Sequence, residues 1–431
     1  MAIPLLKTVA DGVQLCAVQT DLFKTCKLSI SMALPLSGDI AARAILPYLM
    51  RRACRKYPDL TALGGRLDEL YGAVLGAGVS KKGEAQMLHL SLSSIDDRFS
   101  LDGESVSEAA AALLLDLLFD PKLENGVFCT EDIEQEKRLL LERMRSEDDD
   151  KRAYARKRCV EIMCADEAFG KNRFGTAEEI LSLTPERVFA AWREVLETAT
   201  IRVVLVSSGT ADAVERKLTE RFCAIERRVA PIHTQYIEKA LTVKSERETQ
   251  PIRQGTLVMG FRCGMRNRMD MDPAMMMMSD IFGGGTYSKL FTVVREQMSL
   301  CYYCASRLNR DKGILFVAAG IDSDNEEKTK QAILDQLRAM QNGDFTEETF
   351  EIAKRSLCDS IRGYTDSPDV LCAWYDIQIL EGTARSTAER IADIQAARFE
   401  DIQKAAQQIS LDTVFMLAGT EVDDDDGNGD S

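Results

Sequence analysis

The sequence predicts an α+β fold of two similar αβ domains, each a sheet covered by helices on one face. Three observations lead to this prediction. A chain of 431 residues is too long for one hydrophobic core and suits two domains of roughly 200 residues. Stretches with the period of a strand are interleaved with stretches of helical period. The same order of strand, helix, glycine-rich run, turn and strand occurs twice, about 220 residues apart.

The first copy lies in the N-terminal half. We expect an opening strand near 13–18, and then the repeated parts: a strand at 28–36, a helix at 41–53, a helical run after glycines at 63–70, a turn at 81–83 and a strand at 87–93. A helix over 109–119 follows, which Ser105 and Glu108 open as a capping box. Later helices begin at Thr130 and at Thr184-Pro185, and a strand at 201–207 closes this half.

The second copy is organised around Gly283, Gly284 and Gly285, which let the backbone adopt positive φ values or approach another segment closely. A helix follows, with an apolar face formed by Tyr287, Leu290, Phe291, Val294 and Met298. The other parts of this copy are strands at 255–261, 301–306, 314–319 and 413–418 and helices at 273–281, 325–340, 347–362 and 386–398.

Composition divides the chain into four ranges. We predict an N-terminal domain at 1–226, a polar linker at 227–253, a C-terminal domain at 254–420 and a disordered acidic tail at 421–431. The net charge of −15 argues against nucleic acid and anionic membranes as partners. We predict no signal peptide at 1–7 and find no apolar run long enough to span a membrane, so we expect a cytoplasmic protein with reduced cysteines.

A family resemblance rests on the glycine-rich segment and the residues after it. Gly283-Gly284-Gly285, Ser288-x-Leu290-Phe291 and Val294-Arg295-Glu296-x-x-x-Leu300-x-Tyr302 resemble the pitrilysin/insulinase family of zinc peptidases, which includes the mitochondrial processing peptidase subunits. A looser likeness lies at 134–137. The resemblance implies a clam-shell half formed by the two domains, with Arg295 and Tyr302 beside the substrate.

The zinc motif of that family is missing. Active members carry H-x-x-E-H and a distal glutamate; here Ile45, Tyr48 and Leu49 fall on the motif positions and Arg143 on the distal one. The chain has only two histidines, His89 and His233, and neither has a second histidine at a helical zinc spacing. We therefore expect no hydrolytic centre and no metal or other cofactor bound by this chain.

The resemblance implies an inactive subunit that pairs as a heterodimer with a zinc-bearing homologue and processes a peptide or protein. Tyr302 would stabilise the oxyanion, and Arg295 would hold the substrate. The alternative is a non-catalytic scaffold or binding module of the same fold. An independent enzyme of another class, such as one with a Cys-His nucleophile, stays open without a supporting feature.

Structural interpretations remain open for these residues. Arg295 is also typical of a helix edge, and Tyr302 of a strand. We expect Tyr303 to face the opposite side of the strand from Tyr302 and to pack in the core. In strand geometry Cys301 and Cys304 would face opposite sides too, which disfavours a redox pair. His89, in an alternating strand, is expected to be either a surface histidine or a hydrogen-bonded one, without a catalytic role. The glycine segment lacks the spacing of a phosphate loop.

Overall fold

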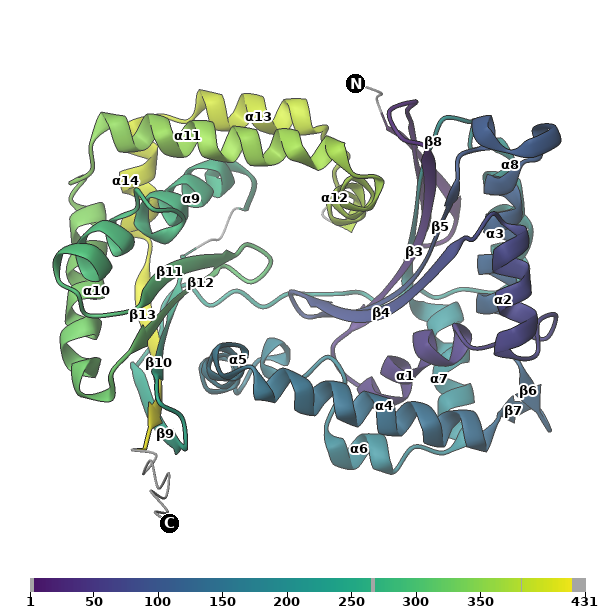
Figure 1. Cartoon of the computed structure of the whole chain (residues 1–431), viewed down its shortest axis with the longest axis horizontal. Helices are drawn as coiled ribbons and strands as arrows, with labels where there is room; N and C mark the ends of the chain where they lie inside the picture. Colours follow the sequence, from purple (N-terminus) through teal and green to yellow (C-terminus); the bar gives the residue numbers. More distant parts are fainter. Residues whose placement is uncertain (1–3, 265–267, 381, 421–431) are drawn as a thin grey trace, which may run out of the picture. The chain divides into compact units, whose positions relative to one another are not determined.

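The computed structural model of the chain describes residues 4–264, 268–380 and 382–420. The described helices and strands form two compact units, each around one large sheet (Figure 1). The first unit comprises the residues up to Arg145, Lys171–Thr234 and Ser360–Ile391. The second comprises Ser146–Gly170, Gln235–Asp359 and the residues from Ala392 onward. The predicted α+β class is confirmed.

A six-stranded sheet with the order β1-β2-β8-β3-β5-β4 is the centre of the first unit. Its strands are β1 (Leu5–Ala10), β2 (Val13–Gln19), β3 (Thr25–Pro35), β4 (Val74–Lys82), β5 (Ala85–Ile95) and β8 (Thr200–Ser207). The helices are α1 (Ile40–Met50), α2 (Leu60–Glu69), α3 (Val106–Phe119), α6 (Ala177–Leu181), α7 (Pro185–Thr198), α8 (Asp212–Phe222) and α12 (Pro368–Leu380). A small hairpin is formed by β6 (Leu123–Glu124) and β7 (Val127–Phe128), and α4 (Thr130–Asp149) follows it.

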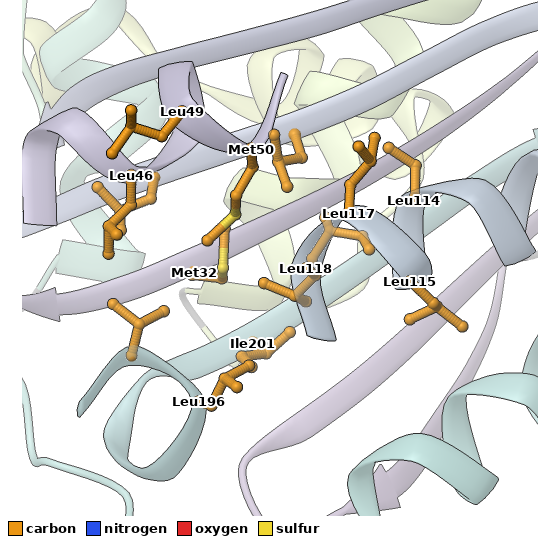
Figure 2. Close-up of a cluster of buried hydrophobic side chains, with 14 of the residues drawn as sticks. Met32, Leu46, Leu49, Met50, Leu114, Leu115, Leu117, Leu118, Leu196 and Ile201 are labelled. Atoms are coloured by element: carbon orange, nitrogen blue, oxygen red, sulfur yellow. The ribbon is translucent and has the colours of Figure 1, made fainter. Parts of the chain in front are cut away.

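The two faces of this sheet are covered by different helices, because alternate strand residues point to opposite sides. Leu28, Ile30 and Met32 of β3 belong to the main hydrophobic core, together with buried residues of α1 and α3. Figure 2 shows part of this core, where Leu46, Leu49 and Met50 of α1 and the leucines of α3 gather near Met32. Cys16, Val18, Val204 and Val206 form the other face, on which α12 packs.

The second unit is organised around a five-stranded sheet with the order β11-β12-β10-β13-β9. Its strands are β9 (Lys244–Gln250), β10 (Gly255–Arg262), β11 (Tyr303–Asn309), β12 (Ile314–Ile321) and β13 (Ser410–Gly419). Its helices are α5 (Lys151–Met163), α9 (Arg268–Gly283), α10 (Glu326–Gln341), α11 (Glu347–Arg362), α13 (Thr387–Ala396) and α14 (Phe399–Gln407), with a π-helical segment at Leu290–Gln297. Val258, Phe316 and Phe415 form the sheet face on which α5 packs.

The two sheets repeat one topology. The order β2-β8-β3-β5-β4 in the first unit corresponds to β9-β13-β10-β12-β11 in the second. In both, the first pair of strands is parallel and the following pairs are antiparallel. The duplicated order of parts in the sequence is therefore a duplication of the sheet.

The compact units are not the contiguous ranges 1–226 and 254–420 predicted from the sequence. The segment 146–170, which contains α5, belongs to the second unit, and 360–391, which contains α12, belongs to the first. Each of these helices buries apolar residues on a sheet that is distant in the sequence, so composition alone does not reveal the exchange. The range 227–253 is not only a linker, because it includes β9. The predicted acidic tail at 421–431 lies outside the described residues.

Most predicted elements are present, with three local corrections. Ser105 is the N-cap of α3, but its side chain donates to Asp97, and the carboxylate of Asp97 accepts from the Ser107 N–H at 2.8 Å, so the cap comes from Asp97. Met298 is 48% exposed and does not continue the buried face of Leu290 and Val294. Cys301 and Tyr302 precede β11, which begins at Tyr303. None of the described helices is long and apolar enough to cross a membrane.

Candidate functional site

The positions that the resemblance assigns to zinc ligands lie on α1 and α4 of the first unit. Ile45 is fully buried, and Leu49 is part of the hydrophobic cluster in Figure 2. Tyr48 is also buried, and the guanidinium carbon of Arg143 lies 3.9 Å from the centre of its ring. The structure thus brings Tyr48 and Arg143 together and places Ile45 and Leu49 in the core.

These four side chains do not fit a zinc ion. Protein zinc sites use imidazole, thiolate or carboxylate ligands, whereas Ile45 and Leu49 have no donor atom and the guanidinium of Arg143 is a cation. Throughout 4–264, 268–380 and 382–420, no group of three or more His, Cys, Asp or Glu side chains is placed to hold a metal ion. The interaction at this place is a cation–π contact between Arg143 and Tyr48.

The acidic side chains on the neighbouring part of α4 are already paired. Arg52, just after α1, donates to Asp132 at 3.2 Å and to Glu136 at 3.1 Å. Arg143 has no such ion pair: its Nη1, like Oε2 of Glu136, is buried and has no hydrogen-bond partner. The site therefore contains a guanidinium whose donors the described part of the protein does not use.

The glycine-rich segment ends α9 and packs closely against β11 in the second unit. A Cβ on Gly283 would lie 2.6 Å from the backbone nitrogen of Ser306 and 2.7 Å from Cδ1 of Leu290. None of Gly283, Gly284 and Gly285 has a positive φ. Close approach, and not a left-handed backbone, is therefore the reason for glycine at 283.

The loop after these glycines is fastened by Tyr287, whose hydroxyl donates to the carboxylate of Asp280 on α9. Burial raises the pKa of Asp280, although this hydrogen bond opposes the shift. Ser288 is fully buried just before the π-helical segment, and its Oγ accepts from the N–H of Phe291 at 3.4 Å. The loop thus fixes where the following helix starts.

Arg295 lies on this π-helical segment and is partly exposed. Its side chain is 39% exposed, and its Nε is 3.5 Å from a carboxylate oxygen of Glu296. The guanidinium also lies over the ring of Phe291, 4.5 Å from the centroid. Among the described residues, its ion-pair and ring partners lie on its own helix, so the outer part of the guanidinium can accept another partner.

Tyr302 stands at the surface just before β11. Its backbone N–H donates to the carbonyl of Gly320 at 2.8 Å, which fixes the residue at the start of the edge strand. The residue is 61% exposed, and its hydroxyl makes a long hydrogen bond of 3.3 Å to Asp322. In the described part of the protein, no hydrogen bond or ring contact joins Tyr302 to Arg295.

Cys301 precedes Tyr302 in the chain and is affected by the charge of Arg295, and its position differs from the predicted one. A hydrogen bond from Cys304 and the nearby charge of Arg295 hold the pKa of the Cys301 thiol below its ordinary value, against the opposing effect of burial. The expectation that Cys301 and Cys304 face opposite sides is wrong, because Cys301 precedes the strand and is not bound by its alternation. Arg295 is therefore close enough to Cys301 for its charge to act there.

Tyr303 and His89 have structural environments. Tyr303 is half-buried, with the guanidinium of Arg152 3.9 Å from its ring centre, which agrees with a packing role. His89 accepts or donates hydrogen bonds on both ring nitrogens, with Ser31 at 2.9 Å and Ser80 at 2.7 Å. Burial lowers the pKa of His89, so the ring is neutral at pH 7. The interpretation of His89 as a hydrogen-bonded structural residue is confirmed.

The sequence did not reveal the buried ionic groups. Glu167 is bound by Arg262 at 2.7 Å and by Lys312 at 2.6 Å, and Arg262 also donates to Asp412 at 2.7 Å. In the first unit Arg202 donates to Asp376 at 2.9 Å. These partners lie far apart in the chain, and no spacing pattern signals them.

Comparison with known proteins identifies related chains along almost the whole length. The model of the peptidase M16 inactive domain matches residues 182–357. A Bacillus subtilis protein, YmfF, described as a probable inactive metalloprotease, is 30% identical over 417 residues, which cover 96% of this chain and 98% of that protein. An uncharacterized zinc protease of Mycobacterium tuberculosis is 25% identical over 312 residues, or 69% of each chain.

Solved structures share the fold. A conserved protein from Enterococcus faecalis V583 has a TM-score of 0.89 and 25% identity, covering 97% of this chain and 99% of that chain. A peptidase M16 inactive domain from Pseudomonas fluorescens has a TM-score of 0.79 and 16% identity, covering 97% of this chain and 98% of that one. The second likeness concerns the fold alone.

Proposed function

The chain belongs to the M16, or insulinase, family of peptidases as a homologue of a probable inactive member, and from this premise we propose that it is the non-catalytic subunit of a heterodimeric peptidase. A zinc-bearing homologue is its partner, and a peptide or protein is the substrate. Zinc is held by the partner, because Ile45, Tyr48, Leu49 and Arg143 do not fit the metal. The complex is cytoplasmic, in keeping with twelve free cysteines in this chain.

The exposure of Tyr302 carries the proposal. Its backbone is fixed by Gly320, whereas its hydroxyl is at the surface with one long hydrogen bond to Asp322. A positioned O–H that is weakly engaged in the free protein can be redirected to a substrate carbonyl. There it would stabilise the negative charge that develops on the oxygen in the transition state.

Arg295 supplies a complementary role in this proposal. Its outer N–H groups are available beside its contacts with Phe291 and Glu296. A guanidinium binds a carboxylate or a backbone carbonyl through several N–H groups in one plane. Arg295 therefore holds the bound peptide, and Tyr302 acts on the reacting carbonyl.

Kinetics of the co-purified complex test this division of labour. Tyr302→Phe is expected to lower kcat by roughly 10²–10³-fold with little change in KM, because a transition-state donor is lost. Arg295→Ala is expected to raise KM, because its charge acts on the bound substrate as well.

Tyr303→Phe is the matched control, since it removes the neighbouring hydroxyl from a half-buried ring and should leave turnover nearly unchanged. Equal turnover of the Tyr302→Phe complex and the parental complex would contradict the catalytic role. Sedimentation of the co-expressed pair should show a mass near twice that of this chain.

A scaffold of the same fold is the second candidate, and one observation favours it. The stacking of Arg295 on Phe291 and its pairing with Glu296 are also what a purely structural arginine would show. A stable heterodimer in which Tyr302→Phe and Arg295→Ala both leave kcat and KM unchanged would decide for the scaffold.

A further inference from the structure

The guanidinium of Arg143 has donors that nothing in the described protein satisfies. Its Nη1 is shielded from solvent and makes no hydrogen bond. None of the described residues forms an ion pair with it, and its guanidinium carbon lies over the ring of Tyr48. A buried charged nitrogen without a partner is costly, and native proteins keep such a group mainly where a ligand or an ordered solvent molecule completes it.

The ring of Tyr48 holds the guanidinium without using its N–H groups. Stacking at 3.9 Å engages the flat face of the cation. The N–H donors lie in the plane of the guanidinium and remain directed away from the ring. Because Tyr48 is only 6% exposed and lies on α1, this support is part of the packed core. The coplanar N–H donors of Arg143 are therefore held at a fixed position.

None of the described acidic side chains on α4 forms an ion pair with Arg143. Arg52 pairs with both Asp132 and Glu136. Glu142, the adjacent residue, is exposed and forms no ion pair with Arg143. Arg143 as a whole is partly exposed, so the guanidinium nitrogens other than the shielded Nη1 are available to a ligand from solution.

We propose that the place where active relatives bind zinc is an anion site in this chain, in which Arg143, supported by Tyr48, binds a carboxylate of a peptide. Two parallel N–H donors match the two oxygens of a carboxylate. A singly charged carboxylate also suits a protein of net charge −15 better than a doubly charged phosphate does. The carboxylate can come from the C-terminus of a peptide or from an acidic side chain.

This inference shares one assumption with the proposed function, namely that the chain binds a peptide. It needs neither a partner nor catalysis. Binding can be measured with the full-length chain alone, so a negative result here leaves the heterodimer untouched. Conversely, failure of the kinetic test at Tyr302 leaves the anion site standing.

Fluorescence anisotropy at low ionic strength tests the site with three labelled tetra-alanine probes. The first has a free C-terminal carboxylate, the second is amidated, and the third is amidated with one alanine replaced by glutamate. We expect the first to bind at least about tenfold more tightly than the second. Binding of the third, if equally dependent on Arg143, identifies an acidic side chain as a second source of the carboxylate. Equal binding of all three probes by the parental chain overturns the proposal without recourse to any variant.

The matched variants are Arg143→Gln and Arg145→Gln, which remove the same charge from the same helix. Arg145 is exposed, so its loss should leave affinity unchanged, whereas Arg143→Gln should weaken the carboxylate probe about tenfold or more. Arg143→Lys keeps the charge without the planar fork and should recover only part of the affinity. An equal loss in Arg143→Gln and Arg145→Gln would show non-specific attraction and overturn the site. So would competition by inorganic phosphate without any preference for the carboxylate probe.

Discussion

The carboxylate of Glu167 is almost completely buried, and a charged donor binds each of its oxygens. Arg262 and Lys312 have side chains that are 2% and 0% exposed, so all three charges are removed from water. Burial alone would raise the pKa of Glu167, but the hydrogen bonds from Arg262 and Lys312 outweigh it and hold the pKa below its ordinary value. Ionisation of this carboxylate is therefore expected to stabilise the second unit.

Glu167→Gln is expected to lower the free energy of unfolding by about 3–5 kcal/mol, because two buried cations lose their shared anion. Urea unfolding followed by circular dichroism measures the change. Glu327→Gln is the control, since Glu327 is 78% exposed and its pair with Lys330 should contribute less than about 1 kcal/mol. Similar midpoints for the two variants would show that the buried cluster is not needed for stability.

The same residue predicts a pH dependence. Its folded pKa is depressed, so its contribution to stability is fully present above the unfolded value of 4.5 and is lost as pH falls through the lower folded pKa. The parental protein should therefore lose stability more steeply below pH 4.5 than Glu167→Gln does. Parallel stability curves in that range would contradict the assignment.

At the scale of single residues, the sequence identified the positions but not their surroundings. It placed Tyr302 and Tyr303 in different environments, as the structure does, but Tyr302 precedes β11, so its exposure does not follow from alternation along the strand. It could not predict that Arg143 lies on Tyr48, since that contact depends on how α1 and α4 pack. The Cys301 prediction was wrong because the strand begins two residues later than its composition indicates.

At the scale of elements, α12 is held to the sheet of the first unit by both apolar and ionic contacts. Leu371, Trp374 and Tyr375 pack on the face formed by β2 and β8. Asp376 reaches the fully buried Arg202 of β8 at 2.9 Å. Nearer the start of the helix, the exposed Asp369 pairs with Lys27 of β3 at 2.7 Å.

The two aspartates of α12 are a natural comparison of a buried pair with an exposed one. Asp376→Asn should destabilise the protein by about 3–5 kcal/mol, because Arg202 is left buried with less compensation. Asp369→Asn should cost less than about 1 kcal/mol, because Asp369 is 63% exposed. Thermal unfolding of the two variants measures the difference, and equal shifts in Tm would refute this account.

The elements that the sequence revealed are those with a strong period or a clear cap. β10 and β12 read as apolar runs, and Thr184 with Pro185 opens α7 as expected. β4 was harder to predict because Gly76 and Gly78 weaken its pattern. β9 is polar throughout and is a strand only because it pairs with β13 at the sheet edge. The π-helical segment has no sequence signature of its own.

At the scale of the whole molecule, we predict that the first and second halves of the sequence do not fold as separate proteins. Each sheet is covered on one face by a helix from the other half of the chain, α12 in the first unit and α5 in the second. A fragment such as 1–226 would lack α12 and expose Cys16, Val18, Val204 and Val206. The fragment 254–420 would lack α5 and expose Val258, Phe316 and Phe415.

Separately expressed 1–226 and 254–420 are therefore expected to be poorly folded and to bind the dye ANS, which reports exposed apolar surface. Near-UV circular dichroism should show little fixed tertiary structure in either. A designed fragment that joins the first unit's segments, with 360–391 appended by a flexible linker and 146–170 removed, should recover cooperative unfolding. Cooperative unfolding of 1–226 by itself would show that α12 is dispensable.

The place of α12 near the end of the chain also has a consequence during synthesis on the ribosome. The strands of the first sheet are complete once Ser207 has emerged, but the helix that covers one of its faces is translated only after residue 368. At a translation rate of roughly 5–20 residues per second, that face stays uncovered for on the order of ten seconds or more before α12 is synthesised. Throughout that interval the nascent chain presents a valine-rich surface to the cell, and chaperones that bind such surfaces have time to act before the last helices arrive.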